Sequence, residues 1–350
     1  MSHFHSLAVA DVRPEIGGAA ASVTFSVPEA LRDTFDWQAG QHLTLRYTVD
    51  GKEHRRCYSI SSPPGGSLRI TVKRVQGGVV SNHIAEQLAA GSRVEVTPPA
   101  GRFVLRAAPL ARRTHYFFGA GSGITPLYAM ISAVLEQEPH SAAHLIYGNS
   151  SADSILFRDE LEALAAAHPD RFTLRHVLSA PSLWSWFSPW RSGRIDAEAI
   201  SAAFAGTPPV AQDVRYWICG PGSMNTSVRQ ALMGLDVPDW RIHMESFGGA
   251  VKGADAEGIA ATAAVILNGA RREIAVAADQ TLLEAALAAG LKPPHSCQSG
   301  VCGACKARLT AGRVRMRAQM ALEDSEVAGG QILCCQAVAE TPELAVAFEG

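Results

Sequence analysis

Apolar and polar residues alternate with a period of two through roughly the first hundred positions. The clearest runs are Ser22–Val27, His42–Tyr47 and Leu68–Lys73, which are separated by turns rich in glycine and proline. Because successive side chains of a strand point to opposite faces, such short runs predict strands with one buried face. The pattern predicts an antiparallel β-barrel over residues 1–108, interrupted by a helix at Ser81–Ala90.

From Thr114 onward, apolar strands are each followed by a helical stretch. These strands are Tyr116–Phe118, Ala143–Tyr147, Phe172–Leu174 and Tyr216–Ile218. Strands that are buried on both faces and alternate with helices are typical of a doubly wound parallel sheet. We therefore expect an α/β domain over residues 109–248.

A segment of small and charged residues without an apolar period follows, and it predicts a linker at residues 249–259. Beyond it, Ala264–Leu267 and Ile274–Val276 predict a hairpin, and Leu282–Ala289 predicts a helix. Residues 260–350 are therefore expected to form a third domain of the α+β class. A chain of 350 residues is long enough for several separate cores.

Four cysteines near the C-terminus have the spacing C-x4-C-x2-C followed by one more after 29 residues: Cys297, Cys302, Cys305 and Cys335. This spacing is the ligand pattern of a plant-type [2Fe–2S] cluster. Gly300 and Gly303 allow the loop to fold tightly, with backbone N–H groups turned toward the sulfurs. The motif predicts a protein that carries electrons.

Zinc and disulfides are the alternatives to a cluster. Structural zinc usually takes two short cysteine pairs, and this chain has only one. Disulfides suit secreted proteins, but the seven cysteines are an odd number and no signal peptide precedes them. Cys334 and Cys335 are neighbours on a predicted strand, so only one of them can reach the iron.

Composition limits the partners and the compartment. The net charge is −2 and no long basic run occurs, so we expect no nucleic-acid binding. No run of about 18 apolar residues predicts a membrane span. The N-terminus lacks the features of a signal peptide, and free cysteines such as Cys57 and Cys219 agree with a reducing compartment. A soluble cytoplasmic protein is expected.

Two glycine-rich turns connect predicted strands to helices, at Gly119–Pro126 and at Cys219–Met224. Glycines let the backbone approach a pyrophosphate, and a helix N-terminus offers it unpaired N–H groups. One such turn is weak evidence, because a tight turn needs no ligand. Two of them would flank one crevice at the carboxyl edge of the sheet, where α/β proteins bind dinucleotides.

The run Arg55–Ile60 predicts a flavin site in the first segment. Arg56 and Tyr58 share one face of the strand. Arginine suits a phosphate, tyrosine suits a flat ring, and a serine such as Ser59 can donate to a ring nitrogen. The turn Gly77–Asn82 offers a further helix N-terminus to the flavin phosphates.

Together these motifs resemble those of the ferredoxin–NADP reductase superfamily, with a C-terminal plant-type ferredoxin domain. Within it, the chain is most similar to the family of reductase subunits of phenylacetyl-CoA epoxidase (monooxygenase), over essentially its full length. The order of the three domains is more specific than any single motif. The resemblance implies a β-grasp fold for residues 260–350, and FAD rather than FMN.

The resemblance also implies roles for matching residues. Arg56 would bind the flavin pyrophosphate, Tyr58 would pack on the isoalloxazine, Ser59 would lie near its N5, and the phosphate turn would contain Gly78 and Ser81. The residues that match the dinucleotide loop are Gly119, Gly121, Thr125 and Pro126. The loop beside the nicotinamide matches Cys219, Gly220 and Pro221, and a Glu-x-Phe element matches Glu245 and Phe247. Ser59 and Cys219 are the predicted catalytic residues, and Cys335, which precedes Gln336 and Ala337, is the predicted fourth iron ligand.

The sequence departs from the family pattern in two places. Relatives commonly carry an arginine and another basic or polar residue where this chain has Ser150 and Ala180, and a guanidinium is the natural partner of a 2′-phosphate. This favours NADH over NADPH, although Ser150 and Ser151 could still bind the phosphate. The other departure is a loop rich in aromatics at residues 183–190, which is either a docking or lid element or a loop packed on its own domain.

Arg313, Arg315 and Arg317 alternate on a predicted strand, with Val314 and Met316 facing inward. Charges of this kind more often protect an exposed strand edge, and the alternative is a basic stripe that meets an acidic partner.

The predicted function is transfer of electrons from NAD(P)H through FAD and the cluster to a separate oxygenase, with one like the phenylacetyl-CoA epoxidase favoured. Nicotinamide gives two electrons together and the cluster accepts one, so a flavin is needed between them. No acid or base is required, and the motifs contain no convincing His–carboxylate pair. The acceptor could instead be a ring-hydroxylating dioxygenase, a steroid hydroxylase or a desaturase. A non-catalytic redox sensor is the alternative of another class, but it would need a blocked nicotinamide site, and both glycine-rich loops are intact.

Overall fold

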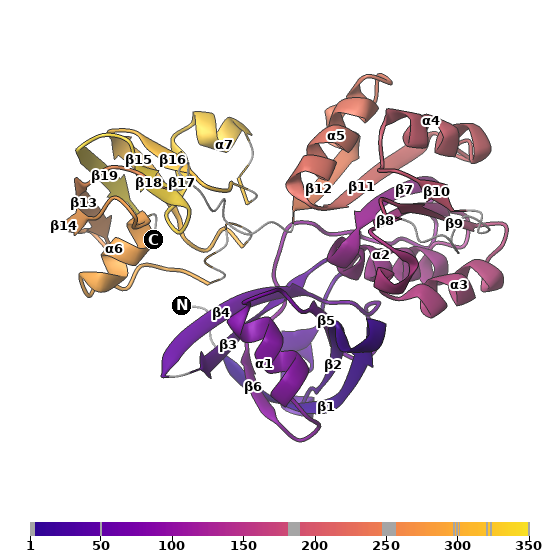
Figure 1. Ribbon diagram of the computed structural model, residues 1–350, viewed down its shortest axis with the longest axis horizontal. Helices are drawn as coiled ribbons and strands as arrows, with labels where there is room; N and C mark the ends of the chain where they lie inside the picture. Colours follow the sequence, from indigo (N-terminus) through magenta and orange to yellow (C-terminus); the bar gives the residue numbers. More distant parts are fainter. Residues whose placement is uncertain are drawn as a thin grey trace. The chain divides into compact units, whose positions relative to one another are not determined.

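The computed structural model describes residues 4–348 apart from 50, 181–189, 247–256, 297, 299, 301, 320 and 323. The chain divides into two units (Figure 1). The larger unit comprises Phe4–His54 and Tyr58–Phe247, and the smaller one comprises the chain from Gly248 onward together with Met1–His3 and Arg55–Cys57. Most of the predicted linker and of the aromatic loop at 183–190 lies outside the described residues, and the predicted domain boundaries stay predictions.

The first part of the larger unit is the predicted antiparallel barrel. Its six strands lie in the order β4-β3-β6-β1-β2-β5. Their bounds are β1 His5–Glu15, β2 Ala20–Ser26, β3 His42–Val49, β4 Lys52–Ser59, β5 Arg69–Lys73 and β6 Arg93–Val96. A bridge between Ile60 and Ile70 joins the two edges, which closes the barrel around an apolar core.

One helix accompanies the barrel, α1 at Val79–Gln87. The predicted bounds, Ser81–Ala90, are therefore wrong by two residues at the start and three at the end. The helix begins earlier because Gly78 takes an extended conformation and serves as its N-cap, and it ends earlier because Leu88 is extended. A glycine at this position is a known helix-start signal.

The second part of the larger unit is the predicted doubly wound sheet, with six parallel strands in the order β10-β9-β8-β7-β11-β12. Their bounds are β7 Arg113–Ala120, β8 Ala142–Asn149, β9 Phe172–Leu178, β10 Arg191–Ser192, β11 Asp213–Gly220 and β12 Ile242–Ser246. The strand order reverses between β7 and β11. This is the place where such folds bind nucleotides.

Four helices cover the two faces of this sheet (Figure 1). They are α2 Ile124–Gln137, α3 Arg158–Ala167, α4 Ala197–Gly206 and α5 Gly222–Met233. On β7, Phe117 packs in the core with α2 and α3, whereas Tyr116 and Phe118 pack in the core with α4 and α5. The strand is buried on both sides, as its continuous apolar sequence predicts.

The smaller unit is a mixed five-stranded sheet in the order β14-β13-β19-β15-β17, with a separate pair of β16 and β18. The strands are β13 Ala261–Leu267, β14 Ala270–Val276, β15 Lys306–Ala311, β16 Val314–Met316, β17 Gln331–Leu333, β18 Ala337–Ala339 and β19 Glu343–Ala347. The helices are α6 Leu282–Ala288 and α7 Asp324–Ala328. The predicted hairpin is confirmed as β13 and β14, which pair antiparallel.

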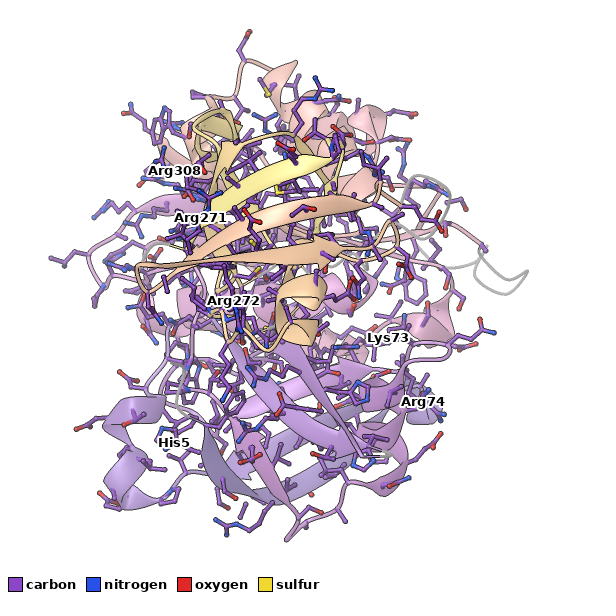
Figure 2. All side chains as sticks on the ribbon, turned by 90° about the vertical axis from the view of Figure 1, so that its left-hand side faces the viewer. His5, Lys73, Arg74, Arg271, Arg272 and Arg308 are labelled. Carbon is purple, nitrogen blue, oxygen red and sulfur yellow. The ribbon has the colours of Figure 1, made fainter. Side chains whose placement is uncertain are left out.

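Of the three alternating arginines, Arg315 lies within β16, and Arg313 and Arg317 lie directly before and after it. Val314 and Met316 pack against the core of the smaller unit, as predicted. Arg315 Nε lies 3.5 Å from Glu340 Oε1, and Arg317 Nη2 donates to the Asp279 carbonyl at 3.1 Å. Figure 2 shows further arginines of this unit, Arg271 and Arg272 on β14 and Arg308 on β15.

No helix among the described residues combines the length and the apolar character needed to cross a membrane.

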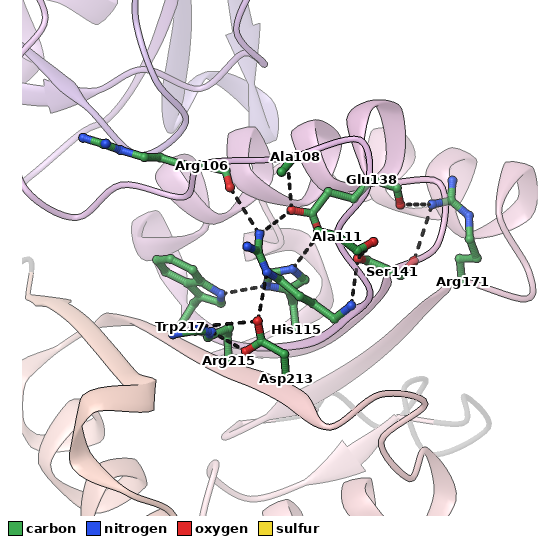
Figure 3. A network of polar contacts seen from close by, with 11 residues as sticks. Arg106, Ala108, Ala111, His115, Glu138, Ser141, Arg171, Asp213, Arg215 and Trp217 are labelled. Carbon is green, nitrogen blue, oxygen red and sulfur yellow. Dashed lines mark hydrogen bonds and ion pairs between the residues drawn. The ribbon is translucent and has the colours of Figure 1, made fainter.

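A buried carboxylate anchors the amino-terminal edge of the parallel sheet (Figure 3). Glu138, at the end of α2, is fully buried and accepts hydrogen bonds from Arg113 Nη1 at 2.7 Å, His115 Nε2 at 3.1 Å and the Ala108 backbone N–H at 3.1 Å. Trp217 Nε1 donates to His115 Nδ1 at 3.1 Å, so Nε2 carries the proton of the neutral ring. Burial would raise the pKa of Glu138, but the hydrogen bonds outweigh it and lower the pKa.

We expect Glu138→Gln to lower the free energy of unfolding at pH 7 by about 2 kcal/mol, because the amide cannot accept all the hydrogen bonds that the buried carboxylate accepts from Arg113, His115 and Ala108, although Arg113 keeps its pair with Asp213. A carboxyl with a lowered folded pKa contributes stability that is present above its unfolded pKa and lost as the pH falls through the folded value. The difference from the wild type should therefore shrink below pH 4.5, the usual pKa of a glutamate. Urea unfolding at several pH values measures this difference in the free energy of unfolding.

Glu136→Gln is the matched control, since Glu136 is an exposed carboxylate on the same helix. An equal loss in both variants at pH 7 would contradict the role given to Glu138.

Candidate functional site

Two turns meet at the carboxyl ends of β7 and β11. The strands are neighbours in register, with Gly119 opposite Cys219. A 3-10 turn at Gly121–Gly123 leads from β7 into α2, and Pro221 is the N-cap of α5. The predicted dinucleotide residues Gly119, Gly121, Thr125, Pro126, Gly220 and Pro221 therefore gather on one edge of the sheet, at the start of two helices. This arrangement suits a pyrophosphate.

The close approach of these turns leaves no room for side chains. A Cβ on Gly123 would overlap the carbonyl oxygen of Cys219. A Cβ on Gly220 would lie 2.7 Å from Met224 Cε and 3.2 Å from the Ala120 nitrogen. Gly121 has a φ of 54°, a conformation that favours glycine.

Thr125 fastens the first turn from within. Its side chain is buried, and Oγ1 donates to the Ser122 carbonyl at 2.9 Å. Tyr147 Oη donates to the Gly121 carbonyl at 2.9 Å from the neighbouring strand. The carbonyls of the turn are held inside the protein, which leaves its N–H groups for a ligand.

Lys73 is a residue of this site that the sequence reasoning missed. It ends β5 of the barrel, beside Arg74 (Figure 2), and its Nζ lies 4.0 Å from the point where a Cβ on Gly121 would stand. A lysine here offers a point charge to a phosphate held by the turn. The available signal was a cation at the end of a predicted strand just before the Gly77–Gly78 turn.

Cys219 and Glu245 face one another across β11 and β12, where they are paired in register. Cys219 is fully buried, and burial together with the Glu245 carboxylate raises the pKa of its thiol well above the usual value. Glu245 Oε2 is buried without a hydrogen-bond partner among the described residues, and this desolvation raises the pKa of Glu245 to about 8. Raised carboxyl pKa values of this kind are typical of functional sites.

Asn225 of α5 was also missed by the sequence reasoning. Its Nδ2 donates to the Glu245 carbonyl at 2.9 Å and to Ser246 Oγ at 2.6 Å. The bonds fix the end of β12 against α5. Only the pairing of distant segments brings these groups together, so no local motif could have indicated it. Phe247, the other residue of the Glu-x-Phe element, lies outside the described residues.

The predicted flavin residues lie on β4 and at the start of α1. Arg56 is exposed and Tyr58 is half-buried on the same face of the strand. Ser59 is 4% exposed, and its Oγ is buried without a partner among the described residues. A buried hydroxyl without a partner costs free energy unless a ligand bonds it, so the site fits a ring that offers an acceptor.

Gly78 and Ser81 form the predicted phosphate turn. A Cβ on Gly78 would lie 2.5 Å from Ser81 Oγ and 3.0 Å from the Val75 carbonyl oxygen. A residue with a side chain therefore does not fit at position 78 without a shift of its neighbours. Ser81 Oγ accepts from the Val75 N–H at 3.2 Å. Because α1 starts at Val79, its first N–H groups are available to an anion.

The described cysteines of the predicted cluster lie in the loop before β15 and in the turn between β17 and β18. Cys334 and Cys335 are therefore in a turn and not on a strand as predicted. Cys305 and Cys335 are buried and Cys302 is half-buried, whereas Cys297 lies outside the described residues. Gly300 and Gly303 have φ values of 80° and 69°. No three His, Cys, Asp or Glu side chains among the described residues gather around one possible ion.

Backbone and amide N–H groups point at these sulfurs. Ala304 N lies 3.5 Å from Cys302 Sγ, Cys335 N lies 3.5 Å from Cys305 Sγ, and Gln336 Nε2 lies 3.6 Å from Cys335 Sγ. Donors directed at thiolates are what an iron–sulfur cluster needs, so the residues fit the group. Cys334 is fully buried as well, but the Gln336 amide is directed at the Cys335 sulfur, and Cys335 stays the predicted ligand.

Gly123→Ala should lower kcat/KM for NADH by about tenfold or more, because the new methyl forces the two turns apart and misplaces the dinucleotide. Gly222→Ala is the matched control, since a Cβ on Gly222 meets nothing within 4 Å. Steady-state reduction of ferricyanide by the purified flavin-loaded protein measures both. Wild-type kinetics in Gly123→Ala would contradict the close approach.

Glu245→Gln should stabilise the protein, increasingly so as the pH rises. A carboxyl whose folded pKa is about 8 holds its proton in the folded state while the unfolded chain has lost it, so folding stability falls between pH 4.5, the usual pKa of a glutamate, and about pH 8. Glutamine removes this dependence. The gain should be small at pH 5 and reach its limit above pH 8.

Urea unfolding at pH 5, 6.5 and 8 tests this expectation. Glu29→Gln, which changes an exposed carboxylate, is the control. A gain that is the same at every pH would show that Glu245 is not held protonated by the fold.

Comparisons with known proteins identify all three regions. The model of an oxidoreductase FAD-binding domain matches residues 11–105, that of an oxidoreductase NAD-binding domain matches 117–230, and that of a 2Fe-2S iron-sulfur cluster binding domain matches 265–340. One subunit of the 1,2-phenylacetyl-CoA epoxidase of Escherichia coli K12 is 37% identical over 355 residues, which cover 100% of this chain and 99% of that protein.

Other relatives belong to further oxygenase systems. The ferredoxin reductase component of the 3-ketosteroid-9-alpha-monooxygenase of Rhodococcus rhodochrous is 34% identical over 93% of this chain and 92% of its own. The solved structure of phthalate dioxygenase reductase has the same fold, with a TM-score of 0.68 and 24% identity over 99% of this chain and 98% of that one. The chain belongs to the ferredoxin–NADP reductase family of FAD- and NAD-binding reductases with a C-terminal [2Fe–2S] ferredoxin domain.

Proposed function

We propose that this reductase component passes electrons from NAD(P)H, through FAD and the [2Fe–2S] cluster, to a multicomponent monooxygenase of the phenylacetyl-CoA epoxidase type. The observation that carries the choice of partner is the likeness to the Escherichia coli epoxidase protein, which extends over the whole chain at 37% identity. The likeness to steroid monooxygenase reductases is lower, at 34%. A steroid hydroxylase is therefore the second candidate acceptor.

The dinucleotide is held by backbone and by one cation. The N–H groups of the Gly121–Gly123 turn and the Lys73 ammonium bind the pyrophosphate, and the missing side chains at Gly123 and Gly220 let it approach. Cys219 lies beside the nicotinamide. Burial raises the pKa of the Cys219 thiol, so the thiol stays neutral. A neutral side chain here excludes water without placing a negative charge beside the nicotinamide ring.

The flavin site is held by residues of the barrel. With FAD bound, the Arg56 guanidinium would hold its pyrophosphate, Tyr58 would cover the ring, and the Ser59 hydroxyl, which is buried without a partner among the described residues, would donate to it. FAD would supply two-electron acceptance from NAD(P)H, and the cluster would supply one-electron transfer to the acceptor. None of these residues has to donate or remove a proton for this transfer, so their task is placement.

We infer a preference for NADH from the residues at the ribose end of the site. Ser150 Oγ lies 3.0 Å from Ser154 Oγ, and Ser151 forms a capping box with Ser154. Both serines are thus already engaged, and neither Ser150 nor Ala180 supplies the guanidinium that suits a 2′-phosphate.

An anaerobic titration of the holoprotein with NADH and then NADPH, followed by visible absorbance and electron paramagnetic resonance, tests the electron path. We expect flavin bleaching and a reduced-cluster signal, at a lower concentration of NADH. Cys302→Ser should abolish the visible bands of the cluster while ferricyanide reduction by NADH persists, because the flavin and nucleotide sites remain. The control Arg271→Gln, at an exposed residue of the smaller unit outside the cysteine motif, should retain both.

Turnover with purified phenylacetyl-CoA epoxidase components and with purified steroid monooxygenase components then separates the two acceptors. If neither nucleotide reduces flavin or cluster in the wild type, the reductase proposal fails and a redox sensor replaces it. If Cys302→Ser also loses flavin reduction, the assignment of separate centres is wrong.

A further inference from the structure

Arg69, the first residue of β5, occupies an unusual place between the two halves of the larger unit. Its Nη2 donates to the Ser61 carbonyl at 2.5 Å, and its carbonyl accepts from the Ser61 N–H at 2.7 Å. Its own N–H donates to Ser62 Oγ at 3.3 Å. Ser61 follows Ser59 by two residues, so Arg69 is fixed to the strand segment that carries the predicted flavin contacts.

The guanidinium of Arg69 reaches the nucleotide half. Its Cζ lies 5.6 Å from the ring centroid of Tyr128 and 5.3 Å from that of Phe157. These two rings are themselves 4.9 Å apart. A guanidinium beside two aromatic faces gains cation–π attraction, more so where water is excluded.

One of the two aromatic residues belongs to the helix that begins at the dinucleotide turn, and the other is held in an uncommon backbone conformation. Tyr128 lies in the first turns of α2, directly after the Gly121–Gly123 turn. Phe157 precedes α3, is buried, and has a φ of 59°, which is uncommon for a residue with a bulky side chain. A residue keeps such a conformation only when its surroundings hold it there.

The Nε of Arg69 is buried without a hydrogen-bond partner among the described residues. The nearby carboxylate of Glu160, on α3, pairs with Arg13 of β1, at 2.5 Å. That second link between the halves is partly exposed, with 48% of the Arg13 side chain accessible, so it should contribute little.

We propose that Arg69 is a positioning residue for electron transfer from the nicotinamide to the flavin. It joins the segment after Tyr58 and Ser59 to the helix that starts at the dinucleotide turn, and so fixes the distance between the two rings. This inference rests on the proposed function. A displacement of about 1 Å at reacting atoms can lower a rate by about 10²-fold. Loss of the contact between Arg69 and Tyr128 is therefore enough to slow flavin reduction.

The test compares Arg69→Gln, Arg69→Lys and Arg13→Gln in the flavin-loaded holoprotein. Anaerobic stopped-flow mixing with NADH measures the limiting rate of flavin bleaching and the Kd of NADH. Arg69→Gln should lower the limiting rate by about tenfold or more, with FAD content and NADH Kd within about twofold of the wild type. Arg69→Lys, which keeps a cation, should recover most of the rate, and Arg13→Gln should be close to the wild type.

A second readout does not depend on activity. Thermal unfolding of the flavin-free protein should give a smaller loss of Tm in the double variant Arg69→Gln/Tyr128→Leu than the sum of the two single losses, because both changes remove the same contact.

The proposal is overturned if Arg69→Gln bleaches flavin at the wild-type rate, or if the Tm losses add. It is also overturned if the rate falls only in proportion to lost FAD, or if Arg69→Lys is as slow as Arg69→Gln. A wild-type protein whose flavin is not reduced by either nucleotide overturns the proposed function instead, and the Tm cycle still tests the contact between Arg69 and Tyr128.

Discussion

The candidate site depends on one backbone contact, the approach of Gly123 to the carbonyl of Cys219. Parallel strands end at the same edge of a sheet, but the turns that follow them normally carry side chains that keep them apart. Here the missing Cβ atoms at Gly123 and Gly220 let the turn after β7 lie against the turn after β11. The starts of α2 and α5 and the thiol of Cys219 are thereby held at one crevice.

The buried carboxyl groups at the two edges of the parallel sheet differ in their hydrogen bonding. At the amino-terminal edge, Glu138 is buried and receives hydrogen bonds from Arg113, His115 and Ala108, so its charge is well compensated. At the carboxyl edge, Glu245 Oε2 is buried without a partner among the described residues, and Ser59 Oγ is buried in the same way in the barrel. Satisfied groups favour rigidity, whereas unsatisfied ones are tolerated where a ligand completes them.

Local sequence signals predict much of the fold and of the candidate site. The periods of the apolar residues give the barrel and the parallel sheet, and the cysteine spacing gives the cluster motif. The start of α1 was missed because Gly78 was assigned to the turn rather than to the cap. Lys73 had such a local signal and was overlooked, whereas Asn225 and Arg69 could not be found in this way, because their partners Glu245 and Tyr128 are distant in sequence and only the folded chain brings them together.

The three regions matched to FAD-, NAD- and cluster-binding families belong to a single polypeptide. Because the regions are covalently connected, the flavin and the cluster do not have to meet by diffusion. Their encounter instead has an effective concentration, which the linking segment sets. Passage of electrons from flavin to cluster is therefore first order and does not change when the protein is diluted. Only two events remain second order, arrival of the nucleotide and collision with the oxygenase. The rate of electron delivery consequently depends on the concentrations of nucleotide and acceptor and not on encounter among the protein's own redox centres.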